Sequence, residues 1–384
     1  MDYFLTEDQI ELRNLVRQIA EEKVRPVAAQ HDRDGTFPWD IVKIFADAGL
    51  FSVVVSEEYG GMGMGVMELV IVTEELSKVC GGIALSVAAS ALGTFPILIS
   101  ANEDQKKRYL PDLASGKNLA AFCLTEPAAG SDAGSMKTRA VKKGDEYILN
   151  GSKVFITNGG VAEVYTVIAV TDPNKGSRGT SAFIVEKNFP GFVVGKHEDK
   201  MGIRASATTE IVFDDCRVPA RNMIGSEGQG FAVAMKTLDK SRPGVAAQAL
   251  GIAQGAFDLA LDYARHRVQF GQPISNLQAI QFMLADMATA IEAARATVYC
   301  AARMIDSGAK NISQPSAMCK LIASDTAMKV TTDAVQIFGG YGYMRDYPVE
   351  KFMRDAKITQ IYEGTNQIQR LVIAHTLMHE AAKG

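Results

Sequence analysis

The chain has 384 residues, of which 47% are hydrophobic and 22% are charged, and its formal net charge is −4. This length and apolar content are sufficient for two or three core-forming units. The small negative charge, without any run of five or six like charges, argues against a nucleic-acid-binding protein.

The first part of the chain, residues 1–117, is predicted to form a helical domain. Thr6, followed three residues later by Gln9, has the spacing of a capping box, and apolar residues recur at helical spacing after it. The uncharged stretch 79–102, rich in Gly, Ala and Ser, is expected to form buried helices and turns. Further helices are expected over 38–49, 65–79 and 103–116.

Residues 118–228 are predicted to form a second domain, built from strands. Runs of β-branched and aromatic residues alternate with turn sequences such as KKGDE, DPNKGSRG and NFPG. This pattern is typical of an antiparallel β barrel or sandwich.

The remaining residues, 229–384, are predicted to form a four-helix bundle from their helical period and segment lengths. The first and longest helix carries Pro243 as a candidate kink. The others begin near Gln278, near Ser316 and after the sequence QIYEGTNQ (360–367). The predicted fold class is therefore α+β and multidomain, with a β domain between two helical domains.

Five cysteines at wide spacing, without a CxxC pair, argue against a disulfide framework and a zinc site and favour reduced, buried thiols. His375 and His379 stand one helical turn apart, but no third ligand accompanies them, so we expect surface histidines and no metal. The N-terminal sequence lacks a signal-peptide pattern, and we find no run of 18 apolar residues. We therefore expect a cytoplasmic protein that binds no membrane.

Common nucleotide-binding and hydrolase motifs are missing from the sequence. No GxGxxG follows a strand, and neither GxxxxGK[ST] nor GxSxG occurs. The glycine-rich YGGMGMG (59–65) lacks the strand, turn and helix context of a dinucleotide site and is better interpreted as a turn. Rossmann, P-loop and serine hydrolase chemistry therefore have no support.

Two stretches of the β domain could approach a flat, phosphate-bearing ligand. LTEPAAGSDAGS (124–135) ends a strand at Thr125 and continues through small residues that expose backbone N–H groups. In NGSKVFITNGG (150–160), Phe155 and Thr157 alternate with apolar neighbours and so share one face of a strand. Taken singly, the first stretch is better interpreted as a loop of turn residues and the second as a half-buried strand.

Two stretches of the helical bundle have the same ambiguity. In RHRVQFGQPI (265–274), Arg267 precedes a helix-stopping Gly and Pro, and its only role could be to balance the helix dipole. In QIFGGYGY (336–343), Gly339 and Gly340 could cap a helix or let a phosphate approach the backbone.

These four stretches, together with MRDAKITQIYEGTNQIQR (353–370) and the order of the three domains, resemble the acyl-CoA dehydrogenase family over essentially the whole chain. Short-chain and butyryl-type members are the most similar. The resemblance implies that FAD lies at the junction of the β domain and the bundle, and that the chain forms a homotetramer.

The resemblance assigns one group of residues to the flavin side of FAD. Phe155 stands where many members have a tryptophan, and it keeps an aromatic face for the flavin. The flavin-side residues implied are Phe122, Leu124, Thr125, Gly130, Ser131, Phe155, Thr157, Thr365 and Gln367.

A second group is implied to reach the pyrophosphate and the ADP half of FAD, in part from a neighbouring subunit, which would require an oligomer. This group comprises Arg267, Gln269, Phe270, Gln278, Gln336, Ile337, Gly339 and Gly340.

For the acyl-CoA substrate, the resemblance implies that Ser131 lies near the pantetheine–phosphate arm and that Asp239 and Arg242 orient this arm. Arg offers a fixed fork of donors for phosphate or carbonyl oxygens, although an ordinary surface arginine is the simpler alternative. Gly364 would let the thioester approach the backbone. His375 stands where several medium-chain relatives carry an arginine near CoA, so the expected CoA contacts differ there.

The implied reaction is α,β-dehydrogenation of an acyl-CoA thioester to the 2-enoyl-CoA, with Glu363 as the base for the α-proton while the β-hydride passes to FAD. A carboxylate with a pKa near the usual ~4.3 is a poor base for this proton, so an apolar pocket is expected to raise the pKa. The Glu363 backbone N–H and a flavin hydroxyl would stabilise the thioester carbonyl. Ser241 occupies the position where isovaleryl-type relatives place the base, and serine cannot serve. Taken alone, Glu363 is better interpreted as a solvated charge at a helix boundary.

Electrons are expected to pass to an electron-transferring flavoprotein. The alternatives are an acyl-CoA oxidase, an enoyl-CoA reductase of an electron-bifurcating complex, and a non-catalytic protein that binds flavin or acyl-CoA. The acyl chain stays open. The stretch 79–102 carries no Arg to hold a second carboxylate, which disfavours glutaryl-type substrates, while Leu92, Phe95 and Tyr362 would limit the chain length.

Overall fold

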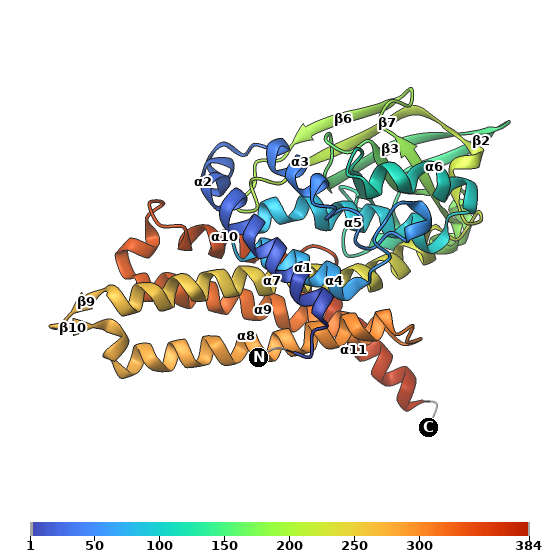
Figure 1. The fold of residues 1–384 in the computed structure, drawn as a ribbon. Coiled ribbons are helices and arrows are strands. Elements are labelled where there is room, and N and C mark those ends of the chain that lie inside the picture. The colour runs from blue at the N-terminus through green and yellow to red at the C-terminus, as the bar shows by residue number, and fades with distance from the viewer. Residues whose placement is uncertain (1–2, 383–384) are drawn as a thin grey trace.

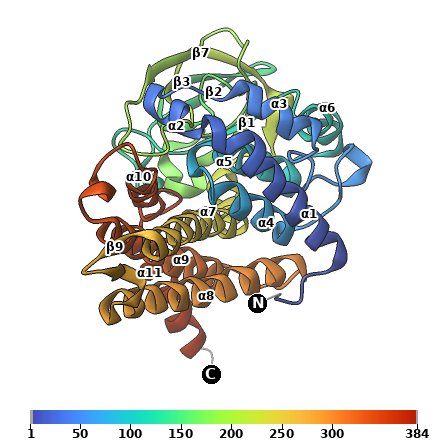
Figure 2. The ribbon, with the colours of Figure 1, turned by 60° about the vertical axis from the view of Figure 1, so that its left-hand side comes forward.

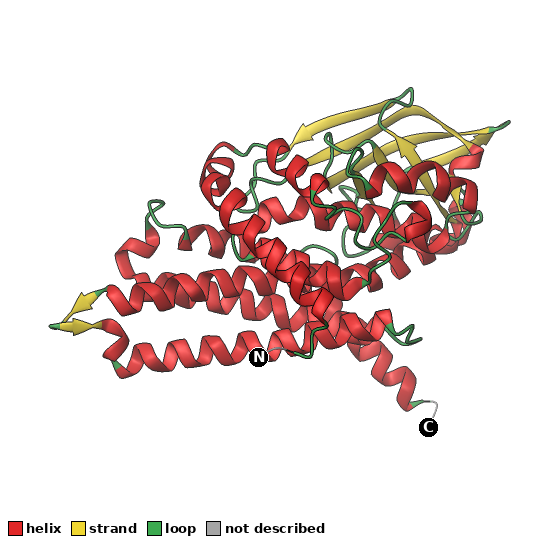
Figure 3. Cartoon of the chain, viewed as in Figure 1, coloured by secondary structure: helices red, strands yellow, loops and turns green. Residues whose placement is uncertain are grey.

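The structure is a computed structural model that describes residues 3–382. The strands of the main sheet gather at one corner of the molecule, and the long helices of the C-terminal part extend away from them (Figure 1, Figure 3). The N-terminal helices lie between these two parts.

The N-terminal part is helical, as predicted. Its helices are α1 (Glu7–Ile19), α2 (Arg25–Asp34), α3 (Trp39–Asp47), α4 (Val66–Ser77), α5 (Gly81–Ser100) and α6 (Glu103–Ala114). The Thr6 hydroxyl accepts a hydrogen bond from the Gln9 backbone N–H at 3.2 Å, which closes the predicted capping box at the start of α1. A π-helical turn, Ala20–Val24, joins α1 to α2.

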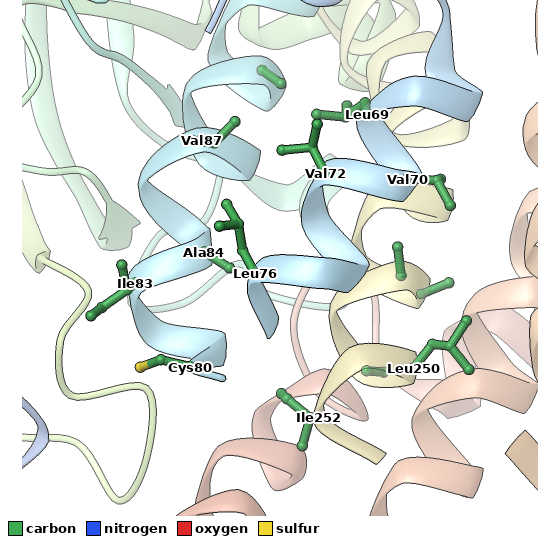
Figure 4. Packing of buried hydrophobic residues seen from close by; sticks show 14 of the residues in the cluster. Leu69, Val70, Val72, Leu76, Cys80, Ile83, Ala84, Val87, Leu250 and Ile252 are labelled. Carbon is green, nitrogen blue, oxygen red and sulfur yellow. The ribbon is translucent and has the colours of Figure 1, made fainter. Parts of the chain in front are cut away.

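The stretch expected to contain helices and turns forms one buried helix, α5, which continues through Pro96. It lies between β1 (Ala120–Cys123) and the long helix α7 (Gly230–His266) (Figure 2). Figure 4 shows side chains of α4, α5 and α7 packed in one core, among them Leu76, Val87 and Leu250. Burial of these apolar faces joins the N-terminal helices to the bundle.

Two helices, α5 and α7, are long and apolar enough to cross a membrane by length and composition. However, 78% and 72% of their most apolar windows are buried inside the protein. The core helix of a folded domain passes the same composition test, so these two helices are weak evidence for a membrane span.

The β domain contains one main sheet with the strand order β6-β7-β3-β2-β4-β5-β8, and β1 pairs with β4 beside this path. Most pairs are antiparallel, as predicted, but β1 and β4 run parallel, and β2 meets β4 in parallel at Arg139 and Val170. The remaining strands are β2 (Arg139–Lys143), β3 (Glu146–Thr157), β4 (Val164–Val170), β5 (Thr180–Glu186), β6 (Phe192–His197), β7 (Thr208–Pro219) and β8 (Met223–Ile224).

The C-terminal part is a helical bundle in which α7, α8 and α9 run lengthwise beside one another (Figure 1, Figure 2). α7 continues through Pro243, and a short hairpin of β9 (Val268–Gln269) and β10 (Gln272–Pro273) connects it to α8 at one end of the bundle. The later helices are α8 (Gln278–Asp306), α9 (Ser313–Phe338), α10 (Val349–Thr359) and α11 (Asn366–Ala381). The sequence did not lead us to expect α10, which precedes the loop that carries Glu363.

Candidate active site

Glu363 lies in the short loop between α10 and α11, here called the base loop (residues 360–365). Its φ is +50°, and the φ of Gly364 is +91°. A left-handed conformation is uncommon for a residue with a side chain and costs energy that the surroundings must supply. Thr365 ends the loop as the cap of α11, because its hydroxyl accepts a hydrogen bond from the Ile368 N–H at 3.3 Å.

The Glu363 carboxylate is held from the long helix α7. The Ser241 hydroxyl donates a hydrogen bond to Glu363 Oε2 at 2.5 Å. Burial raises the pKa of Glu363, while the Ser241 hydrogen bond and the positive charges of Arg242 and Lys320 oppose this rise. The net effect is a raised pKa, which is the direction that a base for a weakly acidic proton requires.

Arg242 is a buried residue and not the ordinary surface arginine that was the simpler alternative. Its side chain is 4% exposed, and its Nη1 donates to Asp239 Oδ1 at 2.5 Å. Asp239 also accepts a hydrogen bond from the Ser313 hydroxyl of α9. Among the described residues, the buried Nε of Arg242 has no hydrogen-bond partner. A buried donor without a partner is costly, which marks it as a point where a ligand oxygen would be stabilised.

Tyr362, next to Glu363, is anchored in the helical core. Its hydroxyl donates a hydrogen bond to Gln248 Oε1 of α7, and Gln248 Nε2 donates to the Gly81 carbonyl of α5 at 2.8 Å. Burial is the main cause that raises the pKa of Tyr362 well above its ordinary value, so this phenol stays neutral. The base loop is thereby tied to two helices of the core.

In the β domain, the end of β1 and the end of β3 lie side by side. Val154 N–H donates to the Thr125 carbonyl at 2.9 Å, and Lys153 Nζ donates to the Leu124 carbonyl at 3.0 Å. Here β3 has a bulge, which interrupts the simple alternation expected for Phe155 and its neighbours. Phe155 has a φ of +59° and is 65% exposed, so an aromatic ring stands in solvent on a strained backbone.

The other predicted flavin-side residues differ in their exposure. Phe122 is partly buried in β1, and Thr157 is partly buried at the end of β3. Gly130 and Ser131 are exposed in the loop after β1, and a Cβ at Gly130 would meet no atom within 4 Å. Gln367 is exposed on α11.

A cleft of about 620 Å³ lies where the β9–β10 hairpin faces the end of α9. Gly339 has a φ of +62°, and a Cβ at Gly339 or Gly340 would meet nothing within 4 Å, so the backbone is open to a ligand there. The Arg267 guanidinium lies 5.4 Å from the centre of the Tyr341 ring and has no carboxylate partner among residues 3–382. Six of the eight residues predicted to reach the ADP half line this cleft: Arg267, Gln269, Phe270, Ile337, Gly339 and Gly340.

Two predicted residues, Gln278 and Gln336, do not line this cleft, although Gln278 begins α8 and Gln336 lies in the last turn of α9. None of the predicted flavin-side residues lines it either. Within one chain, the residues assigned to the two halves of FAD therefore form separate groups.

Three residues of the site escaped sequence reasoning: Gln248, Lys320 and Gln369. All three are buried, and they reach the base loop from α7, α9 and α11. The sequence does place a lysine and two glutamines within apolar helical patterns. Such groups are rarely buried without a polar partner, so this placement could have indicated a buried polar site. Nothing in the local sequence indicates which partner they have.

The chain matches family models over most of its length. Residues 6–117 match the acyl-CoA dehydrogenase N-terminal domain, residues 121–216 the middle domain and residues 228–378 the C-terminal domain.

Known proteins of this family are similar over nearly the entire chain. It is 52% identical over 376 residues to the short-chain-specific acyl-CoA dehydrogenase of Clostridium acetobutylicum, covering 97% of this chain and 99% of that one. Butyryl-CoA dehydrogenase from Megasphaera elsdenii has a similar structure, with a TM-score of 0.96, 48% identity and coverage of 98% and 100% of the two chains.

A third similar chain comes from the structural study of the electron transferring flavoprotein of Acidaminococcus fermentans, which addresses flavin-based electron bifurcation. It has a TM-score of 0.96 and 52% identity, and the match covers 98% of this chain and 99% of that one. With three family models in chain order and relatives matched end to end, the chain belongs to the acyl-CoA dehydrogenase family of FAD-dependent oxidoreductases that act on CH–CH bonds.

Proposed function

We propose that Glu363 is the base of an α,β-dehydrogenation that converts a short-chain acyl-CoA to the 2-enoyl-CoA. The observation that carries this proposal is the half-buried Glu363 carboxylate, which is held by Ser241 and has a raised pKa. A carboxylate of raised pKa in a fixed position is suited to general-base catalysis near neutral pH.

The backbone of the same residue supports the proposal. Among residues 3–382, the Glu363 N–H has no hydrogen-bond acceptor in the protein. A free, fixed N–H beside the base can donate to the thioester carbonyl, on which negative charge grows as the α-proton leaves. We therefore assign the carboxylate to proton removal and the N–H of the same residue to charge stabilisation.

The open glycines and the unpaired Arg267 fit FAD, whose pyrophosphate needs a cation and close backbone approach. In this proposal the cleft residues hold the ADP half, while Thr125, Phe155 and Thr157 lie against the flavin. When bound, FAD supplies the acceptor for the β-hydride. The exposed ring of Phe155 would cover one face of the flavin and exclude water from it.

Arg242 and Asp239 would orient the CoA arm, with the partnerless Nε of Arg242 as the free donor. Ser131 and Gly364 remain candidate substrate contacts. The short-chain specificity of the Clostridium relative supports a short acyl chain as the substrate.

We also propose that the enzyme is a cytoplasmic homotetramer that passes electrons to an electron-transferring flavoprotein. The separation of the two FAD-binding groups in one chain supports assembly, since one complete site would then need two chains. The Acidaminococcus relative supports the electron acceptor.

Because the study of the Acidaminococcus relative addresses electron bifurcation, a second candidate function is that of an enoyl-CoA reductase in a bifurcating complex. Co-purification with an NADH-linked flavoprotein would favour the reductase, and oxygen consumption during turnover would favour an oxidase.

The acyl group is identified with a substrate panel of butyryl-, isobutyryl-, octanoyl- and glutaryl-CoA. For each substrate, the rate of flavin bleaching is measured under anaerobic conditions. Bleaching fastest with octanoyl- or glutaryl-CoA would contradict the short-chain proposal.

Replacement of the base is the direct test. Glu363→Gln is expected to keep FAD and acyl-CoA binding and to slow flavin bleaching by butyryl-CoA by about 10²- to 10⁴-fold, because the amide cannot take the α-proton. Glu380→Gln, the same change at an exposed position of α11, serves as the control. Bleaching near the wild-type rate in Glu363→Gln would show that another group is the base.

A further inference from the structure

We propose that Lys320 and Gln369 are positioning residues that hold the base loop in its left-handed conformation, and that Lys320 also sets the working pH of Glu363. The inference rests on the proposed role of Glu363 as the base. Lys320 lies outside the motifs by which the sequence resembles the family, and Gln369 lies within the 353–370 motif but has no cofactor or substrate role assigned there.

Lys320 extends from α9 to the rear of the base loop and is fully buried. Its Nζ donates to the Gly364 carbonyl at 2.9 Å and to Asn366 Oδ1 at 2.9 Å. Burial lowers the pKa of Lys320 to about 8, and the charge of Glu363 opposes this decrease. Through its bond to the Gly364 carbonyl, the side chain of Lys320 contacts the backbone directly after the base.

The other buried lysines among the described residues have a different environment. Lys153 is 2.8 Å from a carboxylate oxygen of Glu126, and Lys351 is 2.5 Å from one of Asp355. No carboxylate lies within 4 Å of Lys320 among residues 3–382. A buried ammonium usually requires a direct counter-charge. Lys320 lacks one, so its bond to the loop carbonyl points to a role in the loop.

Gln369 holds the loop from α11 and is also fully buried. Its Nε2 donates to the Glu363 carbonyl at 3.1 Å and to the Gly364 carbonyl at 2.9 Å. With Lys320, it occupies both carbonyls that directly follow the Glu363 side chain. Because peptide groups are planar, fixing these carbonyls fixes the backbone on which the carboxylate stands. A Cβ on Gly364 would lie 2.6 Å from Gln369 Nε2, so this contact also explains the glycine.

The charge of Lys320 adds a second effect. A positive charge near Glu363 favours the ionised carboxylate, so it lowers the pKa that burial raises. Removal of this charge is therefore expected to raise the pKa of Glu363 further, and the fraction of ionised base at neutral pH would fall. The charged and titratable groups around this pair are Arg242 from α7, Asp325 from α9 and Tyr362 from the base loop.

The test uses the holoenzyme with Lys320→Met, which keeps the length of the side chain but removes its charge and donors. Infrared difference spectra titrate the carbonyl stretch of protonated Glu363, with Glu363→Gln to assign the band. We expect this titration and the acidic limb of the kcat/KM profile to move to higher pH. We also expect kcat to fall about tenfold to hundredfold with little change in KM, since misplacing a catalytic group has costs of this size.

Two further variants separate positioning from folding. Lys329→Met makes the same charge change at an exposed site of α9 and should leave both the titration and kcat unchanged. Gln369→Met removes loop donors without a charge and should lower kcat with a smaller pH shift. FAD content and thermal unfolding are measured first, and Lys320→Gln replaces Lys320→Met if the latter does not fold.

The outcomes distinguish this inference from the function on which it rests. If Glu363→Gln retains turnover, the proposed base is wrong, and the inference fails with it. If Glu363→Gln is inactive but the Lys320 variant titrates and turns over like Lys329→Met, only the positioning role is overturned. A shift of the Glu363 titration together with loss of kcat supports the inference, because a purely structural residue would not move the titration.

Discussion

At the scale of single residues, the environment of Glu363 separates a catalytic base from a charge at a helix boundary. The sequence indicated Glu363 and Arg242 as members of one site, and the structure adds Ser241, which was predicted only to be unable to serve as the base. The sequence did not indicate Lys320, because α9 meets the base loop only through tertiary packing. Gln369 follows the loop closely in sequence, but its position does not show that its amide turns back to the loop carbonyls. A periodic pattern identifies which residues are buried, but not which carbonyl a buried amide or ammonium contacts.

Ser241 offers a test of how the base is tuned. Its hydroxyl stabilises the ionised form of Glu363, so Ser241→Ala should raise the pKa of Glu363 and move the acidic limb of kcat/KM to higher pH. Hydrogen bonds to charged groups contribute about 1.5–3 kcal/mol, so we expect at least about a tenfold loss at acidic pH and little loss at alkaline pH. Ser307→Ala, at an exposed position after α8, is the control. An unchanged acidic limb would mean that Ser241 does not tune the base.

At the scale of elements, composition and period predicted the helices and strands, but not the irregular backbone at Phe155 and at Glu363. The capping box of α1 and the helical period of α4 and α7–α9 predicted their elements because local sequence decides them. The bulge at Phe155 and the left-handed Glu363 are set by neighbours from other elements. Such positions violate local preference, and in natural proteins they cluster at functional sites.

The base loop provides a prediction about this stored strain. Gly364→Ala places a Cβ at a φ of +91° and 2.6 Å from Gln369 Nε2, so both the backbone and the contact resist it. We expect a loss of about 1–3 kcal/mol in unfolding free energy, with reduced kcat because the base moves.

Gly308→Ala is the matched control for this change. Gly308 also has a positive φ, of +73°, but a Cβ there would meet nothing within 4 Å. Urea unfolding of the two variants isolates the contribution of the Gln369 contact. An equal loss in both variants would mean that only the backbone conformation matters.

At the scale of the whole molecule, one chain presents two separate groups of FAD-binding candidates. The β-domain group contains Thr125 and Phe155, while the cleft group contains Arg267 and Gly340 at the hairpin end of the bundle. The order of the domains followed from sequence because each has its own period and turn composition. The pairing of two chains depends on the shape and chemistry of their surfaces, which local sequence patterns do not predict. The next two experiments therefore test the assembly.

Arg267 tests the cleft itself. Among the described residues, Arg267 is the only cation in contact with the Tyr341 ring, and Arg267→Ala removes it. The change removes a charge-assisted contact to phosphate, so we expect FAD retention to weaken about tenfold to hundredfold. FAD released during gel filtration measures the effect. Arg265→Ala, two residues earlier and exposed, removes the same charge outside the cleft and should retain FAD. Equal retention in both variants would place the FAD phosphates elsewhere.

The two-chain site makes a stronger prediction when variants are mixed. Arg267→Ala chains keep Glu363, and Glu363→Gln chains keep Arg267. If each FAD is held by the β domain of one chain and the cleft of another, co-expression creates some sites in which both Glu363 and Arg267 are intact. Turnover of the mixed oligomer with subsaturating FAD should then exceed that of either variant alone. If mass spectrometry shows mixed oligomers but turnover does not rise, each FAD is held within a single chain. The proposal that two chains build each FAD site would then be wrong.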